Sequence, residues 1–177
     1  QVMQVIISPE LEDRATITEL CKLHRIPMIE SKKQMERLSD KENVYIIGVF
    51  RKFEKELSKN APHIVLVNPS NMGNLGTIIR TAIGFGIHDI AMIEPAADIY
   101  NPKVVRASMG ALFHMNFRYF DSFENYAAKY DGHEFFPFML DADKTLVPGI
   151  YQGAKPFSLI FGNEATGLDA KFHKYGT

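Results

Sequence analysis

Short apolar runs alternate along the chain with segments in which apolar residues recur at the helical period. In the first third, this pattern predicts strands at 5–7, 26–29 and 44–50, with helices at 15–24 and 31–38 between them. Such an alternation of strands and helices predicts a small α/β unit.

The stretch RKFEKELSKNAP, residues 51–62, interrupts this alternation. It is charged, has few large apolar residues and ends in Asn-Ala-Pro, which is typical of a connecting segment. We therefore expect a boundary near residue 60, with a first domain at 1–57, a linker at 58–62 and a second domain at 63–177.

The second segment repeats the alternation with clearer helical signals. Leu75, Ile78, Ile79, Ala82 and Ile83 form one apolar stripe of a helix, which Gly84 or Gly86 can close in the left-handed conformation. Strands are predicted at 64–67, 89–93, 117–120, 135–140 and 158–161, and further helices begin at Asn101-Pro102 and span 122–130. This order predicts an α/β fold with a mostly parallel sheet flanked by helices.

Composition and charge narrow the class of protein. Hydrophobic residues make up 46% of the 177 residues, which suits a globular core. The net charge of -1 and the pI near 6.7 argue against a general nucleic-acid binder, which would normally be basic, but not against an enzyme that contacts RNA locally.

Cys21 is the single cysteine, so no internal disulfide can form and a reduced, cytoplasmic setting is expected. No apolar run approaches the roughly 18 residues of a membrane span. The chain also opens without a basic start followed by an apolar stretch, so no secretion signal is expected.

The first motif that could carry chemistry is NPSNMGNLGTIIRTA, residues 68–82. A Gly-rich turn between a strand and a helix presents backbone N–H groups and the positive end of the helix dipole, which would stabilise an anion such as a phosphate. The alternative is that these residues only make a tight turn and cap the helix. Arg80 lies roughly 130° from the centre of the apolar stripe, so it either reaches a cleft or is simply solvated.

The second motif is NPKVVRASMGALF, residues 101–113. Its apolar and small residues share one helical face, comprising Val104, Val105, Ser108, Ala111 and Leu112. The small residues Ala107, Ser108, Gly110 and Ala111 suit tight helix packing. Lys103 and Arg106 could hold substrate phosphates or contribute only solubility.

The third motif is SLIFGNEATGL, residues 158–168. Gly162 at the end of a strand could let a ligand lie against the backbone, and Glu164 could be a functional acid or an acid that interacts with a helix dipole. No HExxH, P-loop or GxSxG motif is present, and GFGIHD at 84–89 joins a helix to a strand, which excludes a dinucleotide fingerprint. The histidines and the cysteine form no metal-binding pattern.

In this order and spacing, the three motifs resemble the SpoU (TrmH-type) branch of the SPOUT RNA methyltransferases over about residues 63–168. The resemblance implies a trefoil knot near the C-terminus, S-adenosyl-L-methionine bound in the knot, and a homodimer with active sites at its interface. The expected product is a 2′-O-methylated ribose in rRNA, or alternatively in tRNA. Residues 1–57 are similar to the ribosomal-protein-like, RNA-binding domain that precedes the catalytic domain in many members.

The resemblance also implies roles for individual residues. The catalytic residues would be Asn74, Arg80 and Glu164, and Arg80 would act either as a base with a lowered pKa or as a clamp on the adjacent phosphate. The cofactor would lie against Gly162, with Leu140 and Asp141 on its other side. The full set of expected cofactor contacts is Leu140, Asp141, Phe161, Gly162 and Asn163, and the expected RNA contacts are Lys103 and Arg106.

One departure from the family pattern concerns the last residues, KFHKYGT. Members of this branch carry a further motif with Ser-Leu-Asn that completes the knot, and this chain does not contain it. An incomplete knot and an incomplete cofactor site are therefore expected. The alternative of a non-catalytic RNA-binding protein with the same fold stays open.

Overall fold

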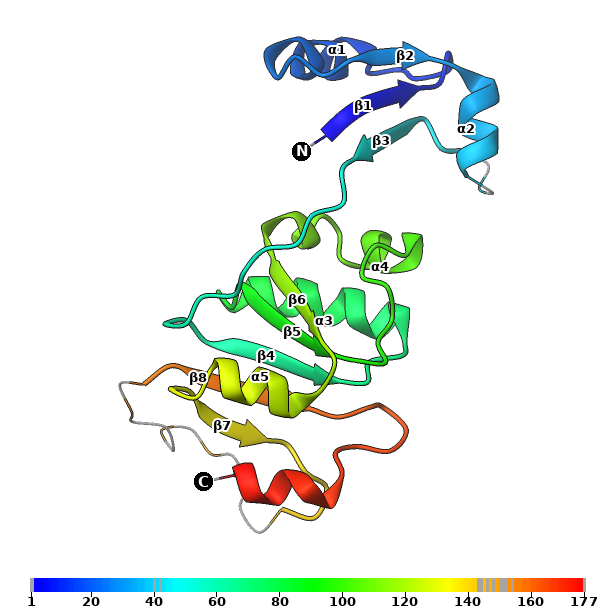
Figure 1. Cartoon of the computed structure of the whole chain (residues 1–177). Coiled ribbons are helices and arrows are strands. Elements are labelled where there is room, and N and C mark those ends of the chain that lie inside the picture. The colour runs from blue at the N-terminus through cyan, green and yellow to red at the C-terminus, as the bar shows by residue number, and fades with distance from the viewer. Residues whose placement is uncertain are drawn as a thin grey trace. The chain divides into compact units, whose positions relative to one another are not determined.

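The computed structural model describes residues 2–39, 41, 43–142, 145, 147, 149, 153 and 155–176. Its contacts divide the chain into two compact units, Gln1–Phe53 and Glu54–Thr177 (Figure 1). Each unit contains its own sheet. The alternation of strands and helices that the sequence predicts is present in both.

The first unit is a three-stranded sheet with two helices. Strand β1 is paired in parallel with β2 and antiparallel with β3, so the strand order is β2-β1-β3. The elements are β1 (Val2–Ile7), α1 (Arg14–Leu23), β2 (Met28–Glu30), α2 (Lys32–Leu38) and β3 (Ile46–Phe50). Helix α2 begins where the sequence predicts, because the Ser31 side chain accepts a hydrogen bond from the backbone N–H of Gln34.

The second unit is built on a parallel five-stranded sheet with the order β6-β5-β4-β8-β7. Its strands are β4 (His63–Val67), β5 (Asp89–Ile93), β6 (Asn116–Phe120), β7 (Glu134–Pro137) and β8 (Phe157–Phe161). Its helices are α3 (Met72–Gly84), α4 (Pro102–Ala107) and α5 (Phe123–Lys129), with 3-10 helices η1 (Ala111–His114) and η2 (Ala170–Tyr175).

Helices cover both faces of this sheet, and α3 and α5 lie on opposite faces (Figure 1). Successive side chains of a strand point to opposite faces. Val65 and Ala91 accordingly pack in one cluster with Phe123 and Tyr126 of α5. All five residues of β5 are buried, as expected for a central strand of a parallel sheet.

Helix α3 confirms the predicted stripe and its predicted end. Leu75, Ile79 and Ala82 are buried, and the chain leaves the helix through Gly86, whose φ is +75°. Tight packing is also present where the second motif predicts it. A Cβ on Gly76 would stand 2.5 Å from the Ala107 Cβ, so only glycine allows α4 to approach α3 this closely.

The second motif does not form one continuous helix, which corrects the face predicted for it. Helix α4 ends at Ala107, Met109 and Gly110 take positive φ values of 50° and 88°, and a separate 3-10 helix follows. The backbone turns at Gly110. Ala111 and Leu112 are therefore buried as part of η1 and not as part of α4. Strand β7 likewise ends at Pro137, before the predicted residue 140.

The stretch that precedes β4 is held by the second unit. Leu57 is buried in the main core cluster, and the Ser58 backbone N–H donates to the Asp89 carboxylate at 2.9 Å. Glu56 forms ion pairs with Arg118 and with Lys129. Residues 56–58 are therefore an ordered part of the second unit.

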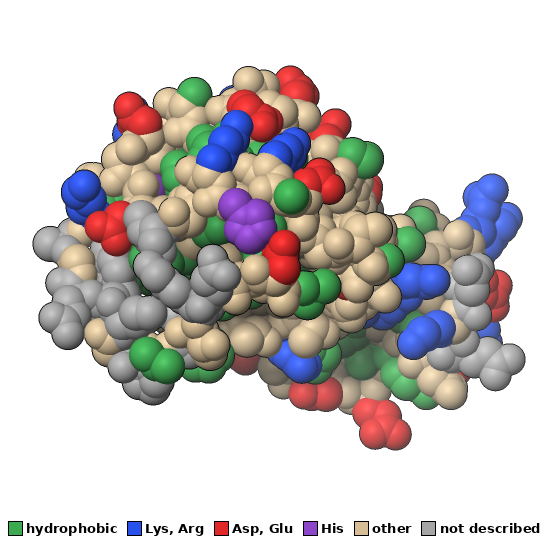
Figure 2. Space-filling model, turned by 90° about the horizontal axis from the view of Figure 1, so that it is seen from below, with side chains coloured by type: hydrophobic (Ala, Val, Ile, Leu, Met, Phe, Trp, Pro, Cys, Tyr) green, Lys and Arg blue, Asp and Glu red, His purple; other side chains and the backbone are tan. Residues whose placement is uncertain are grey.

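Basic and acidic side chains are interspersed on the face of the molecule seen in Figure 2, in line with the net charge of -1. Among the described residues, no helix combines the length and apolar character needed to cross a membrane. The same residues hold no group of three His, Cys, Asp or Glu side chains placed to bind a metal ion.

Candidate active site

The first and third sequence motifs meet at the carboxyl edge of the parallel sheet. Strands β4 and β8 are direct neighbours, with Leu66 paired to Phe161. The loops that follow these strands therefore leave the sheet side by side. Ligands of open α/β sheets bind at this edge.

The loop after β4 turns sharply and then caps α3. Asn68 adopts a left-handed φ of 54°, and its backbone N–H donates to the Ile93 carbonyl at 3.0 Å. The Asn71 side-chain oxygen accepts from the backbone N–H groups of Gly73 and Asn74, at 2.9 and 3.0 Å. These two donors are thus taken by the cap and are not left for a phosphate.

An anion does lie at the start of α3, and it is Glu164 of the chain itself. One carboxylate oxygen accepts from the Asn74 side-chain amide and the other from the Ser70 hydroxyl, both at 3.4 Å. The structure therefore brings together two of the three predicted catalytic residues, which are 90 positions apart in the sequence.

The pKa of the Glu164 carboxyl is lowered from its ordinary value. Burial alone would raise this pKa, but hydrogen bonds from the backbone N–H groups of Glu164 and Asn71 and from the Asn74 and Ser70 side chains outweigh it. The positive end of the α3 dipole acts in the same direction. Glu164 is consequently a carboxylate at neutral pH.

The turn that carries Glu164 is fixed by its neighbours. The Asn163 side-chain amide donates to the Asn68 carbonyl at 2.7 Å, while its oxygen accepts from the Ala165 N–H at 2.8 Å. Asn163 thus ties the loop after β8 to the loop after β4. Asn68 and Ser70 are the residues of this site that sequence reasoning missed, although both lie inside the first motif.

Gly162 is required by the fold of its own loop. A Cβ at this position would lie 2.1 Å from the Gly167 carbonyl carbon and 2.5 Å from the Leu168 nitrogen. The sequence analysis expects the cofactor to lie against Gly162. At the position that a Cβ would take, however, the space is occupied by the backbone of Gly167 and Leu168. Gly167 takes a φ of +69°, which makes the tight return possible.

The segment after β7 runs beside this loop. The Phe138 ring stacks on Phe161, with centroids 4.6 Å apart and planes 10° from parallel, and the Leu140 side chain comes within 3.7 Å of a Cβ built on Gly167. Leu140 is 96% exposed. An open apolar side chain thus stands next to the Gly162–Gly167 loop.

Asp141 points to a different partner. Its carboxylate lies 3.1 Å from the His173 Nε2 of η2, and this hydrogen bond lowers the pKa of Asp141. The contact fastens the segment after β7 to η2. Sequence reasoning did not identify His173.

The predicted basic residues are exposed on α3 and α4. Arg80 is exposed, and no hydrogen bond or ion pair links it to Asn74 or Glu164 among the described residues. It lies six positions after Asn74 on the helix, which corresponds to a rise of about 9 Å and a rotation of roughly 120° from that side chain. Lys103 and Arg106 are exposed on α4.

Comparison with known proteins identifies the family to which this fold belongs. Residues 61–175 match the SpoU rRNA Methylase family, and the chain belongs to this family. It is similar to a 23S rRNA (uridine(2479)-2′-O)-methyltransferase of Streptomyces viridochromogenes, with 44% identity over 50 residues, covering 28% of this chain and 17% of the relative.

Two further likenesses extend over more of the chain. The 23S rRNA (guanosine(2553)-2′-O)-methyltransferase RlmP of Bacillus subtilis is 30% identical over 121 residues, covering 66% of this chain and 47% of the relative. The AdoMet-bound rRNA methyltransferase of Sinorhizobium meliloti shares the fold, with a TM-score of 0.79 over 99% of this chain and 68% of that chain at 22% identity. In both sequence matches, the matched region is less than half of the relative's length.

Proposed function

We propose that this protein is an S-adenosyl-L-methionine-dependent RNA methyltransferase that methylates a ribose 2′-hydroxyl of rRNA. The observation that carries the proposal is the contact of Glu164 with Asn74 and Ser70 at the carboxyl edge of the sheet, in a chain that belongs to the SpoU family. Both sequence relatives described above carry names of 23S rRNA 2′-O-methyltransferases.

The cofactor would be held between the segment after β7 and the loop after β8. Leu140 offers exposed apolar surface beside the loop of Gly162 and Gly167, and such a surface fits a flat, partly apolar nucleoside. Phe161, Gly162 and Asn163 would line one side, and Leu140 with the backbone near Asp141 the other. When bound, the cofactor supplies a methyl group on a sulfonium.

The residues of the chain would orient the substrate. Asn74 donates to Glu164 through its amide N–H, which leaves its carbonyl oxygen to accept a hydrogen bond from the ribose hydroxyl. Glu164, held as a carboxylate, fixes the rotamer of Asn74. Methyl transfer needs a close, in-line approach of the hydroxyl, and this pair would supply that orientation.

Arg80 would bind the phosphate next to the reacting ribose. A guanidinium stays protonated under ordinary conditions and matches phosphate geometry, and Arg80 is exposed on α3. Because no hydrogen bond or ion pair links Arg80 to Glu164 among the described residues of one chain, the proposal includes a homodimer in which a second copy brings its Arg80 to the site. Lys103 and Arg106 of α4 would contact the RNA backbone. We also propose that the catalytic domain forms the trefoil knot that the family resemblance implies.

The test is cofactor binding by calorimetry together with transfer of labelled methyl groups to rRNA. Arg80→Ala should abolish methyl transfer and leave the affinity for S-adenosyl-L-methionine nearly unchanged, because Arg80 is assigned to the RNA. Lys59→Ala, which removes an exposed charge from the second unit, is the matched control and should change neither. Full activity of Arg80→Ala would contradict the assignment of Arg80 to the RNA. Because an incomplete cofactor site is expected for this chain, absence of cofactor binding would favour a non-catalytic RNA-binding protein only if a version extended by the Ser-Leu-Asn motif also fails to bind.

A further inference from the structure

Tyr119 lies outside the three sequence motifs, on β6 at one end of the second sheet. Strands β5 and β4 separate β6 from β8, the strand that leads into Glu164. The next residue of β6, Phe120, packs in the cluster that contains Phe123 of α5. Because successive side chains of a strand point to opposite faces, Tyr119 lies on the other face of the sheet, which α3 covers (Figure 1).

The Tyr119 hydroxyl holds the loop that follows β5. Its oxygen accepts a hydrogen bond from the Ile99 backbone N–H at 2.9 Å, and its proton is donated to the Ala97 carbonyl at 3.1 Å. Ile99 is fully buried, so loss of the hydroxyl would leave its N–H without this partner and away from water. A buried donor in that situation is costly, and the loop would have to shift to relieve it.

The loop after β5 is in turn bonded to the loop after β4. The Ala97 N–H donates to the Pro69 carbonyl at 2.8 Å. The Pro69 carbonyl and the Ser70 nitrogen belong to one planar peptide group. The orientation of the peptide that leads into Ser70 therefore depends on the position of Ala97, which Tyr119 fixes.

Ser70 and its neighbour Asn68 hold the turn that carries Glu164. The Ser70 hydroxyl donates to the Glu164 carboxylate at 3.4 Å, and the Asn68 carbonyl accepts from the Asn163 side-chain amide at 2.7 Å. A distance of 3.4 Å is at the long end of hydrogen-bond lengths, so a small displacement of residues 68–70 is enough to break that contact. Both the carboxylate and its turn thus respond to the loop after β4.

We propose that Tyr119 is a positioning residue of the candidate active site, which keeps Glu164 and Asn74 together through the loops after β5 and β4. Among the described residues, the hydrogen bonds of its hydroxyl go to Ala97 and Ile99, so its effect on the site is indirect. The inference rests on the proposed function, since that function makes Glu164 and Asn74 part of the reaction.

The protonation state of Tyr119 suits this role. Burial of the hydroxyl raises its pKa above the ordinary value of 10.0. The group therefore keeps its proton at neutral pH and can donate to Ala97 while it accepts from Ile99.

The first test is NMR of the 15N-labelled 177-residue chain at neutral pH, with Tyr119→Phe as the variant. The side-chain amides of Asn163 and Asn74 report directly on the contacts with Asn68 and Glu164. Both signals should move in Tyr119→Phe toward the positions of solvated amides, because the loop after β4 is no longer held. Asn163→Asp and Asn74→Asp assign the two signals.

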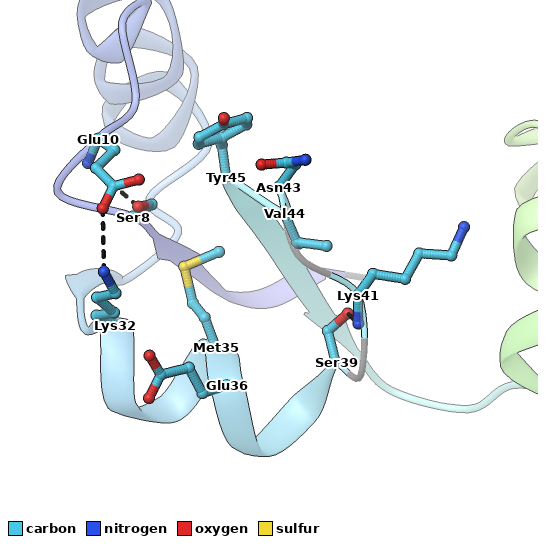
Figure 3. Close-up of a pocket in the computed structure, with 10 residues that line it drawn as sticks. All are labelled: Ser8, Glu10, Lys32, Met35, Glu36, Ser39, Lys41, Asn43, Val44 and Tyr45. Atoms are coloured by element: carbon cyan, nitrogen blue, oxygen red, sulfur yellow. Dashed lines mark hydrogen bonds and ion pairs between the residues drawn. The ribbon is translucent and has the colours of Figure 1, made fainter.

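Two further tyrosines provide matched controls. Tyr130→Phe removes a hydroxyl that donates to the Leu57 carbonyl at 3.4 Å, in the stretch before β4, so it costs a hydrogen bond of the second unit away from the site. Tyr45→Phe removes a hydroxyl from the first unit, where Tyr45 lines a cavity of about 470 Å³ (Figure 3). Neither control should move the Asn163 and Asn74 signals.

The second test is methyl transfer to rRNA. In Tyr119→Phe, kcat should fall roughly two- to tenfold, the range that corresponds to the net loss of one hydrogen bond. The KM for RNA should stay unchanged, because Tyr119 is assigned no contact with the substrate. A higher KM with an unchanged kcat would assign Tyr119 to substrate binding and overturn the positioning role.

Unchanged Asn163 and Asn74 signals in Tyr119→Phe would overturn the inference, whatever the activity. Equal movement of both signals in Tyr130→Phe would overturn it too, because the cause would then be a general loss of stability. Methyl transfer by the parent protein reports on the proposed function separately. If the signals move as expected but no methyl transfer occurs in the parent, the coupling of Tyr119 to Glu164 stands and only the proposed function is contradicted.

Discussion

Glu164 and its partners show what single residues contribute to the site. A helix N-terminus favours an anion, and the chain supplies that anion itself, through a side chain distant in sequence from the helix. The Asn71 cap meanwhile takes the two N–H groups of the first turn. The start of α3 is therefore arranged to hold Glu164 in place rather than to receive a free phosphate.

We expect Glu164→Gln to reduce methyl transfer by roughly ten- to 150-fold, the range that corresponds to the loss of a hydrogen bond to a charged group. The neutral amide loses the charge, and its NH2 group would turn a donor toward the donors that now surround the carboxylate. Initial rates of methyl transfer measure the effect. Glu19→Gln on α1 is the control, and an unchanged rate in Glu164→Gln would remove Glu164 from the site.

The same carboxylate predicts the direction of a pH effect. Because the folded pKa of Glu164 is lowered below its ordinary 4.5, its contribution to folding stability is present above that value and is lost as the pH falls through the lower folded pKa. Urea unfolding of the parent chain and of Glu164→Gln should therefore differ at neutral pH and converge in acid. A constant difference at all pH values would contradict the lowered pKa.

At the scale of elements, close backbone approaches position the site. Gly76 lets α4 lie against α3, and Gly162 lets the loop after β8 return against itself through Gly167. A Cβ on Gly76 would collide with the Ala107 Cβ and the backbone of α4, and a Cβ on Gly162 would collide with backbone; none of these atoms belongs to a flexible group. Both glycines are visible in the sequence, but their packing partners could not be predicted from it. The atoms that the glycines face belong to residues that come near only when the chain folds.

Gly162→Ala should destabilise the second unit by roughly 1–3 kcal/mol, the usual cost of overpacking, because its Cβ would lie 2.1 Å from the Gly167 carbonyl carbon. Gly132→Ala is a matched control, since a Cβ there meets nothing within 4 Å. Urea unfolding followed by circular dichroism measures both. Equal stability of the two variants would show that the loop can move aside without cost.

At the scale of the whole molecule, a buried polar network joins the amino edge of the sheet to the stretch before β4. The His63 and His133 rings each donate through Nε2 to a backbone carbonyl, of Ser58 at 2.7 Å and of Lys59 at 3.0 Å. Their Nδ1 atoms lie 2.8 Å from the Tyr126 hydroxyl and 2.9 Å from the Ser158 hydroxyl. Burial lowers the pKa of His63 to about 4 and also lowers that of His133.

This network predicts that stability is lost in mild acid. Since the folded pKa of His63 lies below the ordinary 6.5, the unfolded chain binds more protons between these values, and stability falls as the pH drops from about 6.5 toward about 4. The shift corresponds to roughly 3 kcal/mol for His63. Between pH 4 and 7, the unfolding midpoint should change less with pH in His63→Gln than in the parent chain. The exposed His24→Gln variant is the control and should show the same pH dependence as the parent. Equal pH dependence in His63→Gln and the parent would refute His63 as the origin of the effect.

The sequence by itself determined the α/β class, most strands and helices, the helix start at Asn101-Pro102 and the residues of the three motifs. These features depend on local periodicity and on side chains that form hydrogen bonds within a few positions, so the local sequence is sufficient to predict them. The break after α4 was missed because the apolar positions 104–112 keep the helical period while Met109 and Gly110 turn the backbone.

Only the tertiary structure decided which distant residues meet. The parallel pairing of β4 with β8 places Glu164 against Asn74 and Ser70, and no local pattern encodes that register. It also revealed that Gly162 faces its own loop, that Asp141 pairs with His173, and that the first unit carries a cavity beside Tyr45. Each of these contacts joins segments separated along the chain, and their geometry follows from packing rather than from sequence order.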